Sequence, residues 1–79
     1  MEAIEAVKQA AGSAGVPITH IGRAMGKRDN YVSNAARRGS SPQANTLAAM
    51  LEPCGYVLAA VPREDLPAGA LVIDPPAAG

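Results

Sequence analysis

The sequence predicts a mainly α-helical domain of four short helices followed by a C-terminal β-hairpin. Apolar residues recur at helical spacing through the first two thirds of the chain, and glycines and prolines divide that part into four short segments. From residue 56 onward, β-branched and apolar runs replace the helical spacing. With 79 residues, of which 48% are hydrophobic, the chain suits one small domain and is not of the disordered class.

The first two helices are expected over residues 2–13 and 17–25. Their apolar positions are Ile4, Val7 and Ala11 in the first helix and Ile18, Ile21 and Met25 in the second. Gly26 should end the second helix, because a glycine just past the last periodic residue suits the left-handed backbone of a helix end. Gly22 costs roughly 1 kcal/mol against alanine inside a helix, so it indicates that another helix comes very close.

The third helix is expected over residues 30–38, with Asp29 as its N-cap. It has two distinct faces. Val32, Ala35 and Ala36 form an apolar face that should pack, whereas Asn30, Ser33, Asn34 and Arg37 form a polar face. Such a face can be merely solvated, but short amide and hydroxyl side chains are poor surface helix formers, which favours a binding role for it.

The fourth helix is expected to begin at Ser41-Pro42, a hydroxyl N-cap followed by proline at the first helical position. Pro53 should end it near Glu52, because proline has no amide to donate and clashes with the preceding turn. The apolar stripe of this helix consists of Leu47, Met50, Leu51 and Cys54. The four helices together predict a helical domain over residues 1–55.

The C-terminal segment is expected to form a β-hairpin over residues 56–74, as an arm of the same domain, followed by a flexible tail over 75–79. A lone hairpin is marginal in water, and both strands here are apolar on nearly every residue. They need cover on both faces, which one small protomer does not provide. We therefore expect a homodimer through the arm, with contacts from Tyr56, Leu58, Val61, Leu71 and Ile73.

The formal charge of the whole chain is zero, but it is unevenly distributed. Residues 18–41 hold five basic residues against Asp29 alone, a net charge of +4, and the rest of the chain carries −4. A local cluster of cations on a neutral body is the electrostatic pattern of an element that reads a nucleic-acid groove.

Residues 18–37 resemble the helix-turn-helix of the Cro and phage-repressor family, also called the XRE family. That family has a small residue within the first helix, a glycine four residues later and an aliphatic residue six further on, and Gly22, Gly26 and Val32 occupy those positions. The resemblance covers about residues 3–58. The sequence departs from the pattern at Lys27, where an aliphatic residue is usual, and at Pro53, inside what is normally the last turn of a helix.

The resemblance implies that the third helix enters the major groove of double-stranded DNA. Asparagine and arginine pair with adenine and guanine edges, whereas cations and hydroxyls at the margins hold phosphates. The expected base contacts are Arg28, Asn30, Ser33 and Asn34. The expected phosphate contacts are Thr19, Lys27, Tyr31, Arg37 and Arg38.

The predicted function is therefore a sequence-specific transcriptional regulator, most simply a repressor, that reads a pseudopalindromic operator as a dimer. Half-site centres should be roughly 34 Å apart, or a multiple of this distance. Two alternatives stay open: an antitoxin that binds a cognate toxin and regulates its own gene, or a protein-binding inhibitor with this fold that does not bind DNA.

No enzyme activity, cofactor or metal site is expected, because one His and one Cys make neither a metal site nor an oriented catalytic pair. Cys54 is expected to be a small buried side chain and His20 a solvent-facing one. The absence of a signal core and of a membrane-length apolar stretch predicts a cytoplasmic protein with no membrane partner.

Overall fold

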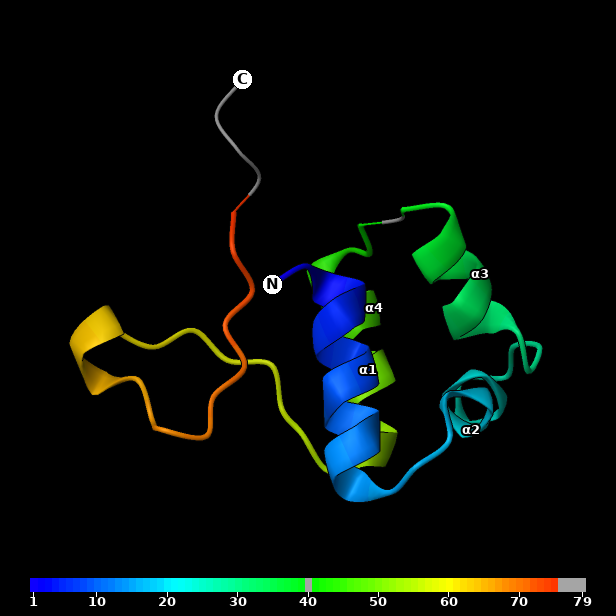
Figure 1. The fold of residues 1–79 in the computed structure, drawn as a ribbon, viewed down its shortest axis with the longest axis horizontal. Helices are drawn as coiled ribbons and strands as arrows, with labels where there is room; N and C mark the ends of the chain where they lie inside the picture. Colours follow the sequence, from blue (N-terminus) through cyan, green and yellow to red (C-terminus); the bar gives the residue numbers. More distant parts are fainter. Residues whose placement is uncertain (40, 76–79) are drawn as a thin grey trace.

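A computed structural model of the chain describes residues 1–39 and 41–75. The α-helices within these ranges are α1 (Ala3–Ala14), α2 (Ile18–Ala24), α3 (Tyr31–Arg37) and α4 (Ala44–Leu51), and two short 3-10 turns follow, η1 (Glu52–Cys54) and η2 (Arg63–Asp65). Figure 1 shows α1 beside α4, with α2 and α3 on one side of this pair and the residues after Gly55 on the other. No helix in the described part of the chain is long and apolar enough to cross a membrane.

The four predicted helices are present, and two of their predicted ends are confirmed. Gly26 follows α2 with a φ of 71°, the left-handed conformation expected of it. Helix α4 ends at Leu51 and continues as the 3-10 turn that contains Pro53, which fits the loss of a backbone donor at proline.

The expected start of α4 at Ser41-Pro42 is wrong, because the helix begins at Ala44. Gln43 keeps an extended backbone, with φ −64° and ψ 157°, and its carbonyl accepts the first helical hydrogen bond, from the amide of Leu47 at 2.9 Å. Leu47 is also the first buried residue of this helix. Packing against the core, more than the local proline signal, sets where α4 begins.

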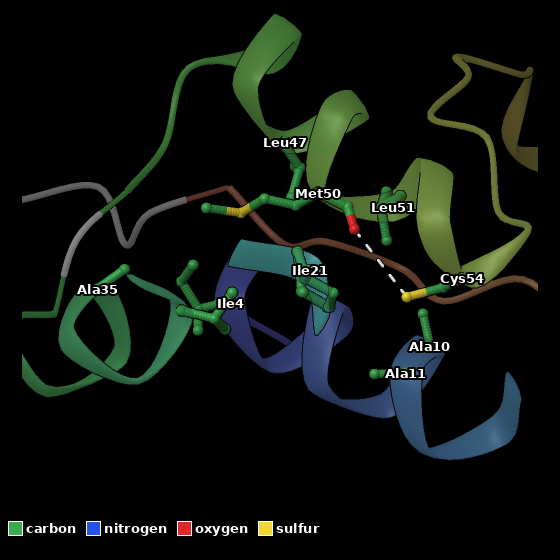
Figure 2. Close-up of a cluster of buried hydrophobic side chains, with 11 residues drawn as sticks. Ile4, Ala10, Ala11, Ile21, Ala35, Leu47, Met50, Leu51 and Cys54 are labelled. Carbon is green, nitrogen blue, oxygen red and sulfur yellow. Dashed lines mark hydrogen bonds between the residues drawn. The ribbon is translucent and has the colours of Figure 1, made fainter. Parts of the chain in front are cut away.

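The core consists of mostly small apolar side chains from all four helices and η1, and Figure 2 shows this cluster. Because these side chains are small, the helices can lie close together. Among the described residues no polar or charged side chain is buried. The buried cluster contains Ile4, Val7, Ala10, Ala11, Ile21, Val32, Ala35, Leu47, Met50, Leu51 and Cys54.

The predicted β-hairpin over residues 56–74 is wrong, since no β-strand occurs in residues 1–39 or 41–75. We call residues 55–75 the C-terminal arm. Its burial alternates along each apolar run, so that Tyr56, Leu58, Leu71 and Ile73 pack against the protomer's own core, whereas Val57 is 83% exposed. The two runs therefore use their inward side chains against the helices instead of hydrogen bonding to each other.

The far end of the arm is attached to the start of the chain. The Met1 amino group donates to the Val72 carbonyl at 3.1 Å and pairs with the Asp74 carboxylate, and the Asp74 amide donates to the Met1 carbonyl at 3.0 Å. These bonds pair the Val72 carbonyl and the Asp74 amide with the first residue of the chain and not with the other apolar run of the arm. Of the flexible tail expected over 75–79, residues 76–79 lie outside the described residues.

Candidate nucleic-acid interface

The turn between α2 and α3 lies directly against Gly22. A Cβ at this position would fall inside the contact distance of the Arg28 carbonyl oxygen and 3.3 Å from the Cβ of Tyr31. The Lys27 amide also donates to the Gly22 carbonyl at 2.8 Å. A close approach at Gly22 is confirmed, but the nearest atoms belong to the turn backbone at Arg28 and not, as predicted, to another helix; the first residue of α3, Tyr31, comes next.

A two-pronged ion pair closes the same turn. Arg23 Nε donates to Asp29 Oδ1 and Arg23 Nη2 to Asp29 Oδ2, both at 2.8 Å. These hydrogen bonds hold the pKa of the Asp29 carboxyl below its usual value and raise the pKa of Arg23. The pair is exposed, so its contribution to stability is small, but its geometry joins α2 to the residue that leads into α3.

The expected role of Asp29 as the N-cap of α3 is therefore wrong. Asn30 occupies the N-cap position and no side chain caps the helix, because both Asp29 oxygens face the Arg23 guanidinium. Since this pair is neutral as a unit, the net charge of +4 over residues 18–41 is carried by four other residues, Lys27, Arg28, Arg37 and Arg38.

An open hollow lies beside the turn and the exposed side of α3, and we call it the basic hollow. Three cations, two amides and a phenol contribute to it. Val32 and Ala35, on the opposite side of α3, are buried in the core. The lining residues are Gly26, Lys27, Arg28, Asn30, Tyr31, Asn34 and Arg38. Six of the nine residues expected to contact DNA are thus brought together in one place.

The other three expected DNA contacts do not line the basic hollow. Ser33 is half-buried on α3, and Thr19 is exposed on α2. Arg37 is exposed and donates from Nη2 to Asn34 Oδ1 at 2.6 Å. Tyr31, which does line the hollow, also packs against the core, and Lys27 Nζ lies 5.8 Å from the centre of its ring.

The C-terminal arm does not cover this surface. In Figure 1 the arm lies on the side of α1 away from α2 and α3, and Arg28 and Asn30 are exposed. The basic hollow is therefore open to solvent on the side of α3 away from the core.

Most of the residues expected at a dimer interface are not available for one, because they face the core of their own chain. Tyr56, Leu58, Leu71 and Ile73 face the protomer's own core, and only Val61 of the predicted set is a large exposed side chain. Sequence reasoning missed the other exposed apolar side chains of the arm, Val57, Leu66 and Val72. A strict alternation of polar and apolar residues along the two runs would have identified the exposed positions. Here nearly every residue of each run is apolar, so the sequence gives no such signal.

Cys54 and His20 occupy ordinary structural positions. Cys54 is buried, its Sγ lies 4.0 Å from the Met50 carbonyl (Figure 2), and burial raises the pKa of its thiol, so the neutral form is favoured. His20 is exposed on α2. In residues 1–39 and 41–75, no three His, Cys, Asp or Glu side chains group as a metal site would require.

Comparison of the chain with protein-family models, with curated protein sequences and with solved structures finds no match.

Proposed function

We propose that this protein is a sequence-specific DNA-binding regulator that places α3 in the major groove. The observation that supports this most strongly is the composition of the basic hollow, where Lys27, Arg28 and Arg38 lie beside the amides of Asn30 and Asn34. Cations attract the phosphate backbone and fix the protein's register, while amide and guanidinium groups read base edges.

The chemistry of the side chains suggests how these roles are divided. Arg28, Asn30, Ser33 and Asn34, on the turn and on α3, are proposed to contact bases. Lys27, Tyr31 and Arg38, which line the hollow, and Thr19, which lies outside it, are proposed to hold phosphates. Few phosphates are neutralised per protomer, so non-specific binding should be weak.

A second copy of the chain is the proposed partner in DNA binding, and it would associate through the C-terminal arm. All four large hydrophobic side chains that are most exposed belong to the arm, namely Val57, Val61, Leu66 and Val72. Exposed apolar residues concentrated in one segment suggest an interaction surface. A dimer would read two related half-sites, and repression of a nearby promoter is the simplest outcome.

Selection of bound oligonucleotides from a random pool, at near-physiological salt, tests the proposal. A recovered pseudopalindromic site supports it, and a pool without enrichment contradicts it. On the selected site, Asn34→Ala should weaken binding by about 1 to 3 kcal/mol and relax preference at one base position. Arg38→Ala should weaken binding to all sequences similarly and lower the salt dependence by about one ion per protomer.

The exposed apolar side chains of the arm favour one competing function, in which the arm binds another protein and DNA is not a ligand. An antitoxin would combine both properties, with a toxin as the protein partner. A salt titration separates DNA binding from apolar association, because only the first releases counterions and weakens linearly in log salt. A complex that hardly responds to salt would favour the protein-binding function.

A further inference from the structure

The amide of Asn34 has a defined orientation because Arg37, one turn later on α3, holds its oxygen. Arg37 Nη2 donates to Asn34 Oδ1 at 2.6 Å. A guanidinium has donors and no acceptor, so the end of the amide that faces Arg37 must be the oxygen. A hydrogen bond from a charged donor is about twice as strong as a neutral one.

This orientation decides which end of Asn34 is available in the basic hollow. Asn34 lines the hollow and Arg37 does not. Since Oδ1 and Nδ2 diverge from the same carbon, an amide with its oxygen toward Arg37 leaves Nδ2, with two N–H donors, for a group bound in the hollow. Lys27, Arg28 and Arg38, which line the same hollow, also carry only donors.

A surface of donors matches one base edge better than the others. In the usual asparagine–adenine pair the side-chain oxygen accepts from N6 while the nitrogen donates to N7, so both ends of the amide are needed. Guanine offers two acceptors, N7 and O6, in the major groove, whereas adenine offers one acceptor beside a donor, thymine offers one acceptor and cytosine offers a donor. With one lone pair of Oδ1 bonded to Arg37, which lies outside the hollow, Asn34 presents mainly its N–H donors, and two adjacent acceptors suit those donors best.

We infer that Asn34 selects guanine and that Arg37 is the positioning residue that sets this choice. The charge of Arg37 alone would suggest a phosphate contact, and this inference replaces that role. The inference rests on the proposed function and names the base class that α3 recognises. Removal of the Arg37 guanidinium would free the amide to rotate and to offer both ends to adenine.

Selections from a random oligonucleotide pool with the wild type and four variants test this inference. Asn34→Ala identifies the base position that Asn34 reads, where the wild type should prefer guanine. Arg37→Ala should lower the guanine-to-adenine ratio at that position about tenfold, within the discrimination of one bidentate contact. Arg37→Lys keeps a cationic donor and should retain most of the guanine preference. Arg63→Ala, an exposed arginine on the arm, should change nothing.

Each contrary result has a distinct meaning. A wild-type preference for adenine at the Asn34-dependent position, or no position that depends on Asn34, would overturn the inference while leaving DNA binding intact. Equal weakening of all sequences by Arg37→Ala, with the base preference unchanged, would make Arg37 a phosphate contact and would also overturn it. No enrichment by the wild type would overturn the proposed function, and this inference with it.

Discussion

Replacement of Gly22 by alanine should destabilise the protein, although alanine is the better helix former by about 1 kcal/mol. The new Cβ would overlap the Arg28 carbonyl oxygen, which is backbone and cannot rotate away. Overpacking of this kind costs about 1 to 3 kcal/mol, and displacement of that carbonyl also weakens its 3.1 Å hydrogen bond from the Tyr31 amide, worth about 1 kcal/mol. The expected net loss is about 1 to 3 kcal/mol.

Urea and thermal unfolding, followed by circular dichroism at the helical band, measure this loss. For a chain of this size each kcal/mol lowers Tm by roughly 4 to 8 °C. Gly12 provides the matched control, because it also lies within a helix and a Cβ there would meet nothing within 4 Å. Gly12→Ala should therefore gain about 0.5 to 1 kcal/mol. Equal gains from both substitutions would refute the close approach of the turn to α2.

Three further predictions concern the ion pair, the thiol and the arm. At pH values above about 4, the unfolded pKa of Asp, Asp29→Asn should cause a small loss of stability. The difference from wild type should vanish as pH falls through the lowered folded pKa of Asp29, which urea titrations between pH 6 and pH 2 would follow. Cys54 should react with iodoacetamide far more slowly in the native protein than in urea, because the thiol is buried and its pKa is raised. Val57→Lys should change monomer stability by less than about 0.5 kcal/mol but weaken self-association in sedimentation equilibrium, and an unchanged dimer would place the interface elsewhere.

The helices were predictable because their signals are local. Apolar spacing and the glycine after α2 depend on residues a few positions apart, and their placement is confirmed at Gly26 and at Pro53. The arm was not predictable in the same way. A strand requires a partner, and the partner is chosen by packing across the whole fold; here the inward side chains Tyr56 and Ile73 are satisfied by the core, and no ladder forms.

The candidate site shows a similar division. Residue type and helical spacing were enough to group Asn30 and Asn34 with the neighbouring cations in one hollow. Competition between two local partners was harder to foresee: Asp29 could cap α3 or pair with Arg23, and the charged partner across the turn holds both of its oxygens. Opposite charges that flank a tight glycine turn were the available signal.

The position of the arm has a consequence for operator architecture. Along the longest dimension of the molecule, 38 Å, the arm occupies one end and α3 the other (Figure 1). Two copies joined arm to arm would therefore carry their reading helices at the outer ends of an elongated particle. If the two copies are joined end to end along this axis, the particle fits contacts two turns of duplex apart, roughly 68 Å, better than contacts one turn apart, roughly 34 Å.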